Sequence, residues 1–428
     1  MNQQQSPFEQ IISNTTSKED ALTFLRISSE NLSDIAFLDH IAQLQSKIKD
    51  YSQTTKTLHR MLSMTNDSQA TAAIRSNLAS TYNKLNDPEA ALAQLNQLPD
   101  DISTKMEIAL SHYFLADYER SEEIMREIAE TPNLPEQIRD RIEYNLAIYE
   151  LERGDFRKGY YQYIEKGHRI HIWPTQQRAM IPLWKGEVEE GKTIIIHGEG
   201  GIGDEIIGIR FMNKIKELGM NPIWKTNNRD LHVVFNRNGY ECVLDFDEID
   251  TFDAAQVMAM YLPVYLNLDK DELWNGIYLK PSERYIEKWN KKLPQGRKLA
   301  VKWQGNTGYD QDLHRSLPID KIRDLCYDGT KINLQLESEL KNDWSHSPDI
   351  NNIEDTLAIL WLCDDVITSC TSIAHMAGAI GQKVTVCPPI AYYYVWAKGT
   401  KWYGDHVTVI RQTEHNNWNK VFEQINVK

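Results

Sequence analysis

One stretch of the sequence, residues 192–211 (KTIIIHGEGGIGDEIIGIRF), constrains the fold more than any other. Its β-branched run at 193–196 is typical of a buried strand. A glycine-rich turn follows, and apolar residues then recur at helical spacing at Ile206, Ile207, Ile209 and Phe211. The stretch therefore predicts a strand, a tight loop and a helix.

The glycines of the turn spell G-x-G-x-x-G, the pattern of dinucleotide-binding loops, at Gly198, Gly200 and Gly203. In such loops a pyrophosphate lies at the helix N-terminus. Here Asp204 and Glu205 place two carboxylates at that position, and like charges repel strongly at close range. The next predicted strand, 222–226, also ends without an acid to hold a ribose. The dinucleotide hypothesis is therefore disfavoured.

Asp204 itself has two interpretations. As a general base it would face a cleft and remove a proton from a substrate. As an acid in the first turn of a helix it would only cap that helix, where carboxylates are favoured in any case. This stretch alone does not decide between the two.

Length and composition bound the remaining possibilities. A chain of 428 residues is long enough for two or three domains. The net charge of -14 argues against a broad nucleic-acid-binding face. The five cysteines are scattered without metal-ligand spacing, as expected of reduced thiols in a cytosolic protein. The N-terminus lacks a signal-peptide pattern and no apolar run reaches membrane-spanning length, so we predict a cytoplasmic protein without an integral membrane segment.

Residues 8–166 have a helical pattern with almost no strand signal. Four segments in this region are similar to one another in sequence, and they begin at Asp50, Asp87, Asp117 and Asp155. Each is predicted to be a turn that opens the second helix of a pair. Their spacing scatters around the tetratricopeptide period of about 34 residues. The region therefore resembles a tetratricopeptide array of about four degenerate units.

Such an array has two functional interpretations. Its concave face commonly binds a peptide or protein partner. Alternatively, the array is a rigid arm that docks on the following domain or dimerises. The fold does not decide between them.

The pattern changes after Trp173-Pro174, where short β-branched runs begin to alternate with helical stretches. Eight candidate strands are 193–197, 222–226, 241–244, 299–303, 332–336, 365–368, 383–387 and 407–411. This alternation predicts parallel sheets in two Rossmann-like halves, with a seam between residues 279 and 297 and a cleft at the carboxyl ends of the strands. The predicted domains are 1–170 for the repeats, 171–290 for the N-terminal Rossmann-like half and 291–428 for the C-terminal Rossmann-like half.

The second half offers polar groups at strand ends. Lys302 and Arg315 are cations beside loops and are candidates for binding a diphosphate. Gln335 follows another strand and is a candidate for contacting a nucleobase or ribose. The alternative is surface solvation for the two cations and an ordinary strand end for Gln335.

A third strand, 365–368, leads through a cluster of hydroxyls into a helix of small residues. Free amides at that helix start, with the hydroxyls of Thr371 and Ser372, suit an anion such as phosphate. Plain capping of the helix needs no ligand and is the alternative. His375, one turn further on, is either a phosphate ligand or a buried interior histidine.

Residues 182–421 together resemble a known family, through the segments PLWKG, HGEGGIGDEI, VKWQGN, HRSLP, NLQLE and DTLAILWLCDDVITSCTSIAHMAGAIGQKVTV. They are similar to tetratricopeptide-linked glycosyltransferases of the GT-B type. These are related to the heptosyltransferases (glycosyltransferase family 9) and, more distantly, to O-linked N-acetylglucosamine transferase. The resemblance implies an α-solenoid followed by a GT-B fold of two Rossmann-like domains.

The resemblance also implies an inverting transfer of sugar from a nucleotide-sugar donor to an acceptor hydroxyl, with no metal and no separate cofactor. Asp204 maps to the catalytic base, and Gly200, Gly201 and Gly203 map to the loop on the acceptor side. The donor-binding positions would be Lys302, Gln304, Gly305, Asn306, Arg315, Gln335, Thr371, Ser372 and His375. The Asp-x-Asp at 245–247 is predicted to be a solvated loop rather than a metal site.

Two departures from the family pattern stand out. Cys370 precedes the hydroxyl cluster where many relatives have Asp, and the first loop reads Glu-Gly-Gly-Ile-Gly rather than Glu-Gln-Gly-Leu-Gly. The first departure bears on the donor site, and neither removes the candidate base. Two alternatives to a transferase remain, namely a non-catalytic repeat scaffold with a decayed transferase fold and, less favoured, a dinucleotide-binding oxidoreductase. The donor sugar, its nucleobase and the acceptor stay open.

Overall fold

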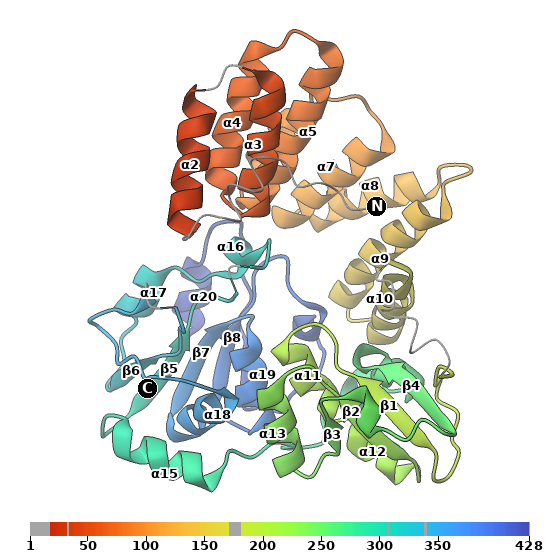
Figure 1. Cartoon of the computed structure of the whole chain (residues 1–428), viewed down its shortest axis with the longest axis vertical. Helices are drawn as coiled ribbons and strands as arrows, with labels where there is room; N and C mark the ends of the chain where they lie inside the picture. The colour runs from red at the N-terminus through yellow and green to blue at the C-terminus, as the bar shows by residue number, and fades with distance from the viewer. Residues whose placement is uncertain (1–17, 32–33, 171–180, 307, 338–339, 428) are drawn as a thin grey trace. The chain divides into compact units, whose positions relative to one another are not determined.

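The computed structural model describes residues 18–31, 34–170, 181–306, 308–337 and 340–427 (Figure 1). The predicted change at Trp173-Pro174, from a helical pattern to alternating strands and helices, lies outside these residues. The chain forms two compact units. The first contains residues 1–131 together with 306–314, and the second contains 132–305 and 315–428. The predicted domain boundaries at 170 and 290 stay predictions.

Helices follow one another through the first part of the chain. Those of the first unit are α2 (Lys18–Asn31), α3 (Ile35–Lys47), α4 (Tyr51–Met64), α5 (Ser68–Lys84), α6 (Pro88–Leu95), α7 (Ile102–Phe114) and α8 (Tyr118–Ala129). Two more, α9 (Glu136–Glu152) and α10 (Phe156–Ile170), belong to the second unit. Consecutive helices pack as pairs: α3 with α4, α5 with α6, α7 with α8, and α9 with α10.

The same turn joins the helices of each pair. In every case an Asp side chain accepts the N–H three residues further on, over 3.0 to 3.4 Å, at Asp50, Asp87, Asp117 and Asp155. The residue before each Asp has a left-handed backbone, with φ between 60° and 81°, at Lys49, Asn86, Ala116 and Gly154. The left-handed residue ends one helix and the Asp caps the next. The four predicted turns are therefore confirmed, whereas assignment to the tetratricopeptide class stays a prediction.

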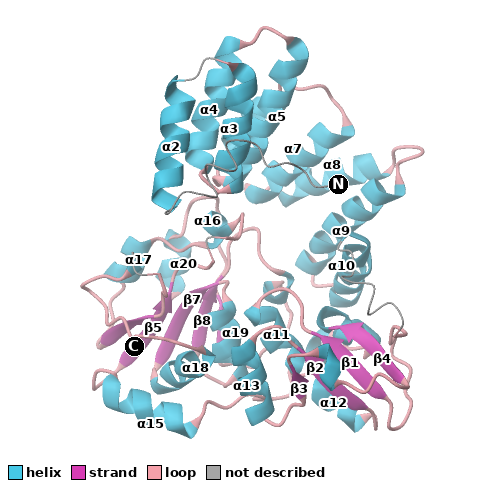
Figure 2. Ribbon diagram, viewed as in Figure 1, coloured by secondary structure: helices cyan, strands magenta, loops and turns pink. Residues whose placement is uncertain are grey.

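The second unit contains two separate parallel sheets (Figure 2). The first has the order β3-β2-β1-β4, built from β1 (Thr193–His197), β2 (Asn221–Lys225), β3 (Cys242–Val243) and β4 (Ala254–Met258). The second has the order β6-β5-β7-β8-β9, built from β5 (Lys298–Lys302), β6 (Thr330–Asn333), β7 (Asp365–Ser369), β8 (Val384–Cys387) and β9 (Val407–Val409). Among the described residues, every strand pair of these two sheets is parallel. We call residues 181–279 the first lobe, and residues 297–305 with 315–427 the second lobe.

All eight predicted strands are present, but β4 was not predicted and β6 is displaced. The β4 sequence, AAQVM, has little of the β-branched character of a central strand. Its Gln256 is buried and lies 2.9 Å from the His197 ring, so tertiary pairing replaces local propensity. Strand β6 ends at Asn333 rather than Leu336, which leaves Gln335 just beyond the strand.

Helices cover both sheets. The first lobe has α11 (Ile202–Ile209), α12 (Met212–Glu217), α13 (Arg229–Arg237) and α14 (Leu262–Tyr265). The linker helix α15 (Glu283–Lys292) lies at the predicted seam. The C-terminal part contains α16 (Asp312–Arg315), α17 (Ile319–Asp324), α18 (Ile353–Leu362), α19 (Ser372–Ala379) and α20 (Asn419–Gln424). Short 3-10 turns are η2 (Phe246–Glu248), η3 (Ala259–Tyr261), η4 (Lys270–Glu272) and η6 (Tyr394–Trp396).

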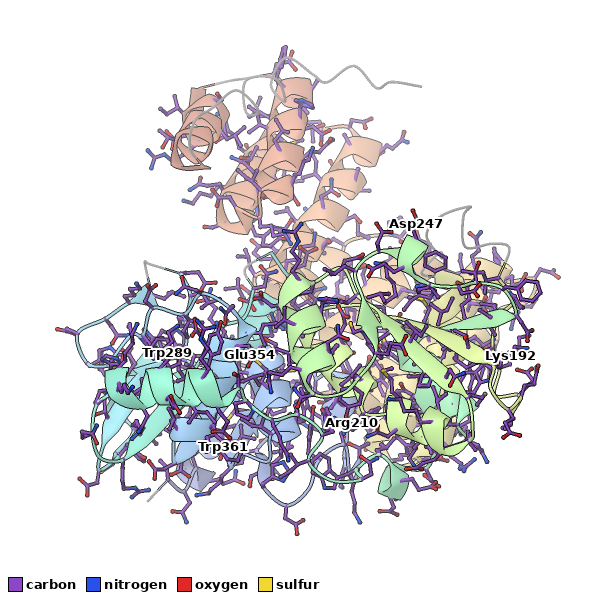
Figure 3. The ribbon with its side chains drawn as sticks, turned by 60° about the horizontal axis from the view of Figure 1, so that its bottom comes forward. Lys192, Arg210, Asp247, Trp289, Glu354 and Trp361 are labelled. Carbon is purple, nitrogen blue, oxygen red and sulfur yellow. The ribbon has the colours of Figure 1, made fainter. Side chains whose placement is uncertain are left out.

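The two lobes share one continuous apolar core, to which α10 contributes Phe156 and Tyr160. Polar contacts add to it. Arg237 of α13 pairs with Glu354 of α18 at 2.6 Å, and Trp289 of α15 donates its indole N–H to Asp355 at 2.7 Å (Figure 3). Helical repeats followed by two parallel α/β lobes are the predicted fold class, which is confirmed.

Candidate functional site

The two lobes meet where α11 packs against α19. The closest approach is at Gly203, in the first turn of α11. A Cβ placed on this glycine would lie 2.6 Å from Cδ2 of His375 on α19, a separation that real side chains do not adopt. The absence of a side chain at position 203 is therefore what lets the glycine turn of the first lobe reach the second lobe.

Asp204, the next residue, takes one hydrogen bond from each lobe. Its Oδ2 accepts the backbone N–H of Gly201 at 2.6 Å, within its own turn. Its Oδ1 accepts the phenol O–H of Tyr393, from the second lobe, at 2.5 Å. The side chain is only partly buried. The same carboxylate therefore caps α11 and also faces the opposite lobe, so its geometry is compatible with both interpretations from the sequence.

Burial dominates the electrostatics around this carboxylate. It raises the pKa of Asp204 above its ordinary value, while the hydrogen bonds from Gly201 and Tyr393 lower it. Burial also raises the pKa of Glu199 to about 7, against the backbone hydrogen bond from Met260, and the charge of Asp204 adds to the rise. Burial raises the pKa of Glu205 as well, so the turn and the start of α11 carry three carboxyl groups that hold protons more tightly than exposed ones.

The other glycines of the turn make room for carboxylates. A Cβ on Gly200 would lie 2.3 Å from an oxygen of Asp204, and one on Gly198 would lie 2.2 Å from an oxygen of Glu205. Gly200 also has a left-handed backbone, with φ of +71°. The space beside these glycines, where a dinucleotide loop holds its pyrophosphate, is filled by acid side chains.

On the second lobe, the start of α19 offers hydroxyl and amide groups. Thr371 caps the helix by accepting the N–H of Ile373 at 3.3 Å, and its hydroxyl lies 3.0 Å from that of Thr368. Within the described part of the chain, no hydrogen-bond partner is recorded for the amide or hydroxyl of Ser372. Arg315 donates to the carbonyl of Cys370 at 3.1 Å, which brings its guanidinium beside this helix start.

Polar groups also gather at the carboxyl ends of β6, β5 and β7, which are neighbours in the sheet. Lys302 ends β5 and donates to the carbonyl of Leu334 at 3.3 Å. Gln335 is 3% exposed, yet neither polar atom of its side chain has a partner among the described residues. The hydroxyl of Ser369, at the end of β7, is fully buried and likewise unpartnered there. Buried polar groups without partners are rare in proteins, which makes Gln335 and Ser369 candidates for contacting a ligand.

His375 is a buried, neutral ring. Burial, with a smaller contribution from the charge of Arg210, lowers the pKa of His375 to about 3. Its Nδ1 lies 2.9 Å from the hydroxyl of Tyr403, and its ring stacks on Trp396 at a centroid distance of 5.1 Å. The histidine therefore packs in the interface between the lobes, and its role as a phosphate ligand stays a prediction.

Arg210, at the end of α11, is an unusual buried cation (Figure 3). It donates to the carbonyl of Trp402 and, at 2.8 Å, to the hydroxyl of Tyr278. Its guanidinium lies 4.6 Å from the ring centroids of both Tyr278 and Tyr403. Backbone carbonyls and aromatic faces thus hold this charge between the two lobes.

The structure brings most predicted residues together in the second unit. Gly203 approaches His375, and Asp204 accepts the hydroxyl of Tyr393. Arg315 of α16 donates to Cys370, which precedes Thr371 and Ser372. Lys302 ends β5, shortly before Gln304 and Gly305, and donates to the carbonyl of Leu334, the residue before Gln335. Asn306 is the exception, since residues 306–314 pack with the helical unit. There Asp310 accepts the hydroxyl of Tyr51 at 2.9 Å, and His314 lies 2.6 Å from the carbonyl of Asn83.

Sequence reasoning missed Tyr393, Tyr403 and the raised pKa of Glu199. The signal for Tyr393 was present, because three consecutive tyrosines, 392–394, follow β8 on the edge of the sheet where ligands bind. Nothing local indicated that Tyr393 would reach a residue 189 positions earlier in the chain.

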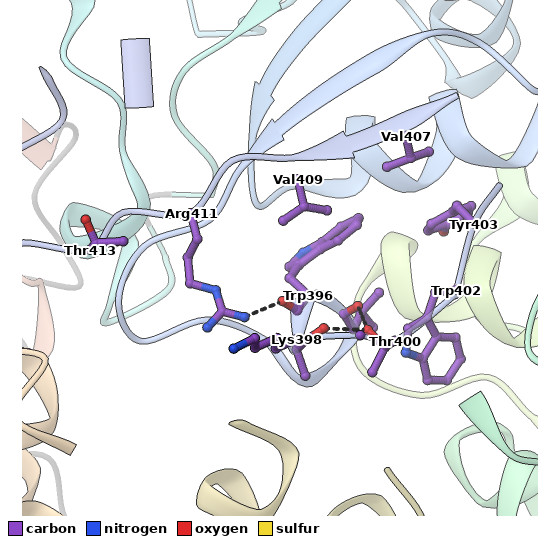
Figure 4. A pocket seen from close by; sticks show the side chains of 12 residues that line it. Trp396, Lys398, Thr400, Trp402, Tyr403, Val407, Val409, Arg411 and Thr413 are labelled. Atoms are coloured by element: carbon purple, nitrogen blue, oxygen red, sulfur yellow. Dashed lines mark hydrogen bonds between the residues drawn. The ribbon is translucent and has the colours of Figure 1, made fainter. Parts of the chain in front are cut away.

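A pocket of about 430 Å³ lies next to this interface, between the 395–403 segment and β9 (Figure 4). Trp396 and Tyr403, which both contact His375, line it. Arg411 also lines the pocket and pairs with Glu152 of α9 at 2.5 Å.

The described residues include no helix that is both long enough and apolar enough to cross a lipid bilayer.

No protein-family model matches the sequence, and no curated protein matches it either. Among solved structures, the chain is similar to a glycosyl transferase of family 9 from Veillonella parvula, with 10% identity over 56% of this chain and 93% of that chain and a TM-score of 0.41. It is also similar to ADP-heptose heptosyltransferase II of E. coli, with 9% identity, coverage of 54% and 96%, and a TM-score of 0.36. An O-GlcNAc transferase from Thermobaculum terrenum is similar over 96% of this chain and 90% of its own, with 11% identity and a TM-score of 0.35. Structures of both predicted classes of glycosyltransferase are thus among those that this chain is similar to.

Proposed function

We propose that this protein is a glycosyltransferase that moves a sugar from a nucleotide-sugar donor to an acceptor hydroxyl, with inversion and without a metal. One observation carries the proposal. The carboxylate of Asp204 on the first lobe faces the second lobe, whose hydroxyl-bearing helix start packs close by. A base on one side and an anion site on the other are what displacement at an anomeric carbon requires.

The proposed reaction is a single displacement. The acceptor hydroxyl approaches Asp204, which takes its proton as the oxygen forms a bond to the anomeric carbon. The bond from that carbon to the diphosphate oxygen breaks on the opposite face, and the nucleoside diphosphate leaves with the electron pair. The raised pKa of Asp204 favours this role, because a carboxylate that binds protons more tightly is a stronger base.

The leaving diphosphate is proposed to lie at the start of α19. Ser372 offers an amide and a hydroxyl there, and Arg315 adds a positive charge beside Cys370. Lys302, at the adjoining strand end, is a second cation for the same anion. Preorganised N–H groups and cations stabilise charge that develops as the bond breaks.

The nucleoside is proposed to contact Gln335 and Ser369. Both are fully or almost fully buried, and the polar atoms of their side chains lack partners within the described residues. An amide can donate and accept at once, which suits the edge of a base or the hydroxyls of a ribose. A bound nucleoside would satisfy groups that otherwise destabilise the empty protein.

Asp245 and Asp247 form the Asp-x-Asp of the chain, and their contacts suit a structural role. Asp245 accepts the N–H of Asp247 at 3.1 Å, and Glu248 accepts the N–H of Asp245 at 2.8 Å. Asp245 and Glu248 therefore cap the 3-10 turn η2. Full activity in the presence of EDTA is the expected result, and a loss restored by manganese would contradict it.

The proposal is tested by measuring thermal unfolding with UDP-, GDP-, ADP- and CMP-sugars. A true donor at about 100 times its dissociation constant should add about 2.7 kcal/mol of stability. Stabilisation by NAD(P) instead would support the oxidoreductase alternative. No stabilisation by any of these nucleotides would support the non-catalytic scaffold.

A further inference from the structure

Tyr393 makes the one direct side-chain hydrogen bond that we find between the second lobe and Asp204 in the described chain. It lies beyond β8, and its hydroxyl donates to Oδ1 of Asp204 at 2.5 Å. Asp204 lies on α11 of the first lobe, so the bond joins two lobes that share no β-sheet. Sequence motifs did not indicate this contact.

The position of Tyr393 is held firmly by its neighbours. Tyr394 follows it and is buried, with its ring centroid 5.1 Å from that of Tyr160 on α10. Trp396, also buried, stacks on His375 and donates its indole N–H to the sulfur of Cys370 at 3.1 Å. The 3-10 turn η6, which directly follows Tyr393, is packed on two sides. These contacts hold the Tyr393 backbone, and with it the hydroxyl, in place.

The two hydrogen bonds to Asp204 fix the plane of its carboxylate. Gly201 holds Oδ2 from within the same turn, and Tyr393 holds Oδ1 from across the interface. Each carboxylate oxygen can accept two hydrogen bonds, so each keeps a lone pair for a substrate hydroxyl. Without Tyr393 the group would be anchored on one side only.

We propose that Tyr393 is the positioning residue of the base, and that its hydrogen bond from the second lobe fixes the orientation in which the Asp204 carboxylate accepts a proton. This inference rests on the proposed function of Asp204.

The hydrogen bond between Tyr393 and Asp204 predicts a change in the pKa of Asp204 that can be measured. The titratable groups that face Asp204 are Glu199 and Glu205 in its own lobe, Tyr160 on α10, and Cys370, Tyr393 and Tyr394 in the second lobe. Arg315 is the cation that faces Cys370. The Tyr393 hydroxyl stabilises the charged carboxylate, so its removal should raise the pKa of Asp204 further.

The test compares Tyr393→Phe with Tyr240→Phe in the full-length protein. Tyr240 is also buried and donates its hydroxyl to the carbonyl of Tyr278 at 3.1 Å, so its variant controls for the loss of a buried hydroxyl. The carboxyl carbons of aspartate are labelled with carbon-13, and the Asp204 signal is identified by its loss in Asp204→Asn. We expect this signal to titrate at higher pH in Tyr393→Phe and at the wild-type pH in Tyr240→Phe. An unchanged titration in Tyr393→Phe, with both variants folded, would overturn the inference.

A second readout uses transfer from whichever nucleotide sugar stabilises the protein. The acid limb of the pH–rate profile should move to higher pH in Tyr393→Phe, with a rate loss of about tenfold at acidic pH, the size of one hydrogen bond to a charged group. If the acid limb of the pH–rate profile does not move in Tyr393→Phe while Asp204→Asn is inactive, the role of Tyr393 is refuted. The proposal that Asp204 is the base then stays intact. Wild-type turnover in Asp204→Asn would instead refute the proposed function.

Discussion

The ring of His375 fills the space that a side chain at position 203 would need, with its Cδ2 2.6 Å from the ideal Cβ position. The two residues come from different lobes and different sheets, and their contact sets how close the Asp204 turn lies to the start of α19. The distance between the proposed base and the proposed anion site therefore depends on a glycine and a histidine that are 172 positions apart in the sequence.

Gly203→Ala should force α11 away from α19. The added methyl group has no room, and overpacking in a close contact typically costs about 1–3 kcal/mol. We expect a lower midpoint of thermal unfolding and a loss of transfer activity. Gly201→Ala serves as the stability control, because its Cβ would meet nothing closer than 3.6 Å and its φ is not left-handed. Equal midpoints for the two variants would contradict the tight contact.

Asp204→Asn should lower turnover by about 100-fold or more while donor affinity stays nearly unchanged, because the amide cannot accept the proton. Steady-state rates and calorimetry measure the two effects. Asp247→Asn is the matched control, since Asp247 is exposed and lies within the 3-10 turn η2 of the other carboxylate motif. A comparable loss in the control would direct attention to a metal at the Asp-x-Asp.

Ser372→Ala should weaken binding of the nucleoside diphosphate by about fivefold, which corresponds to one hydrogen bond of about 1 kcal/mol. Its hydroxyl has no protein partner within the described residues, so stability should not fall. Thr371→Ala combined with Ser372→Ala should weaken binding further and also destabilise the protein, because Thr371 caps α19. Unchanged affinity in the double variant would place the anion site elsewhere.

Gln335→Leu should separate a ligand role from a structural one. The buried amide has no partner in the described chain, so an apolar side chain of similar size removes a penalty of about 1–3 kcal/mol. We therefore expect equal or higher thermal stability without ligand and weaker stabilisation by the nucleotide. Lower stability with unchanged nucleotide binding would show that Gln335 is an ordinary part of the strand end.

Glu199 should make stability depend on pH between about 4.5 and 7. Its pKa is raised to about 7 in the folded protein from 4.5, so in this window the folded state binds more protons than the unfolded state. Stability then falls as pH rises through the window and levels off above it. Glu199→Gln should remove this slope and stabilise the protein by roughly 1–3 kcal/mol above pH 7. Thermal midpoints across this pH range, with exposed Glu190→Gln as control, provide the measurement, and parallel curves for both variants and wild type would contradict it.

Local chemistry explains which parts of the fold were predictable. The four helix-pair turns follow from an Asp that can cap and from a preceding residue that can adopt a left-handed backbone, and both are properties of a few adjacent residues. Strands such as β1 follow from β-branched runs. Strand β4 escaped prediction because Gln256 is stabilised there by His197 and by the carbonyl of Ile181, partners supplied by other segments.

The sequence by itself determined the order of the elements, the glycine turn with its acid, and the hydroxyl cluster before α19, because each depends on neighbours along the chain. Only the tertiary structure decided that Tyr393 reaches Asp204, that His375 packs on Gly203, and that Asn306 belongs to the helical unit. These contacts join residues far apart in the sequence, so they arise from how the lobes pack, and no local propensity encodes them.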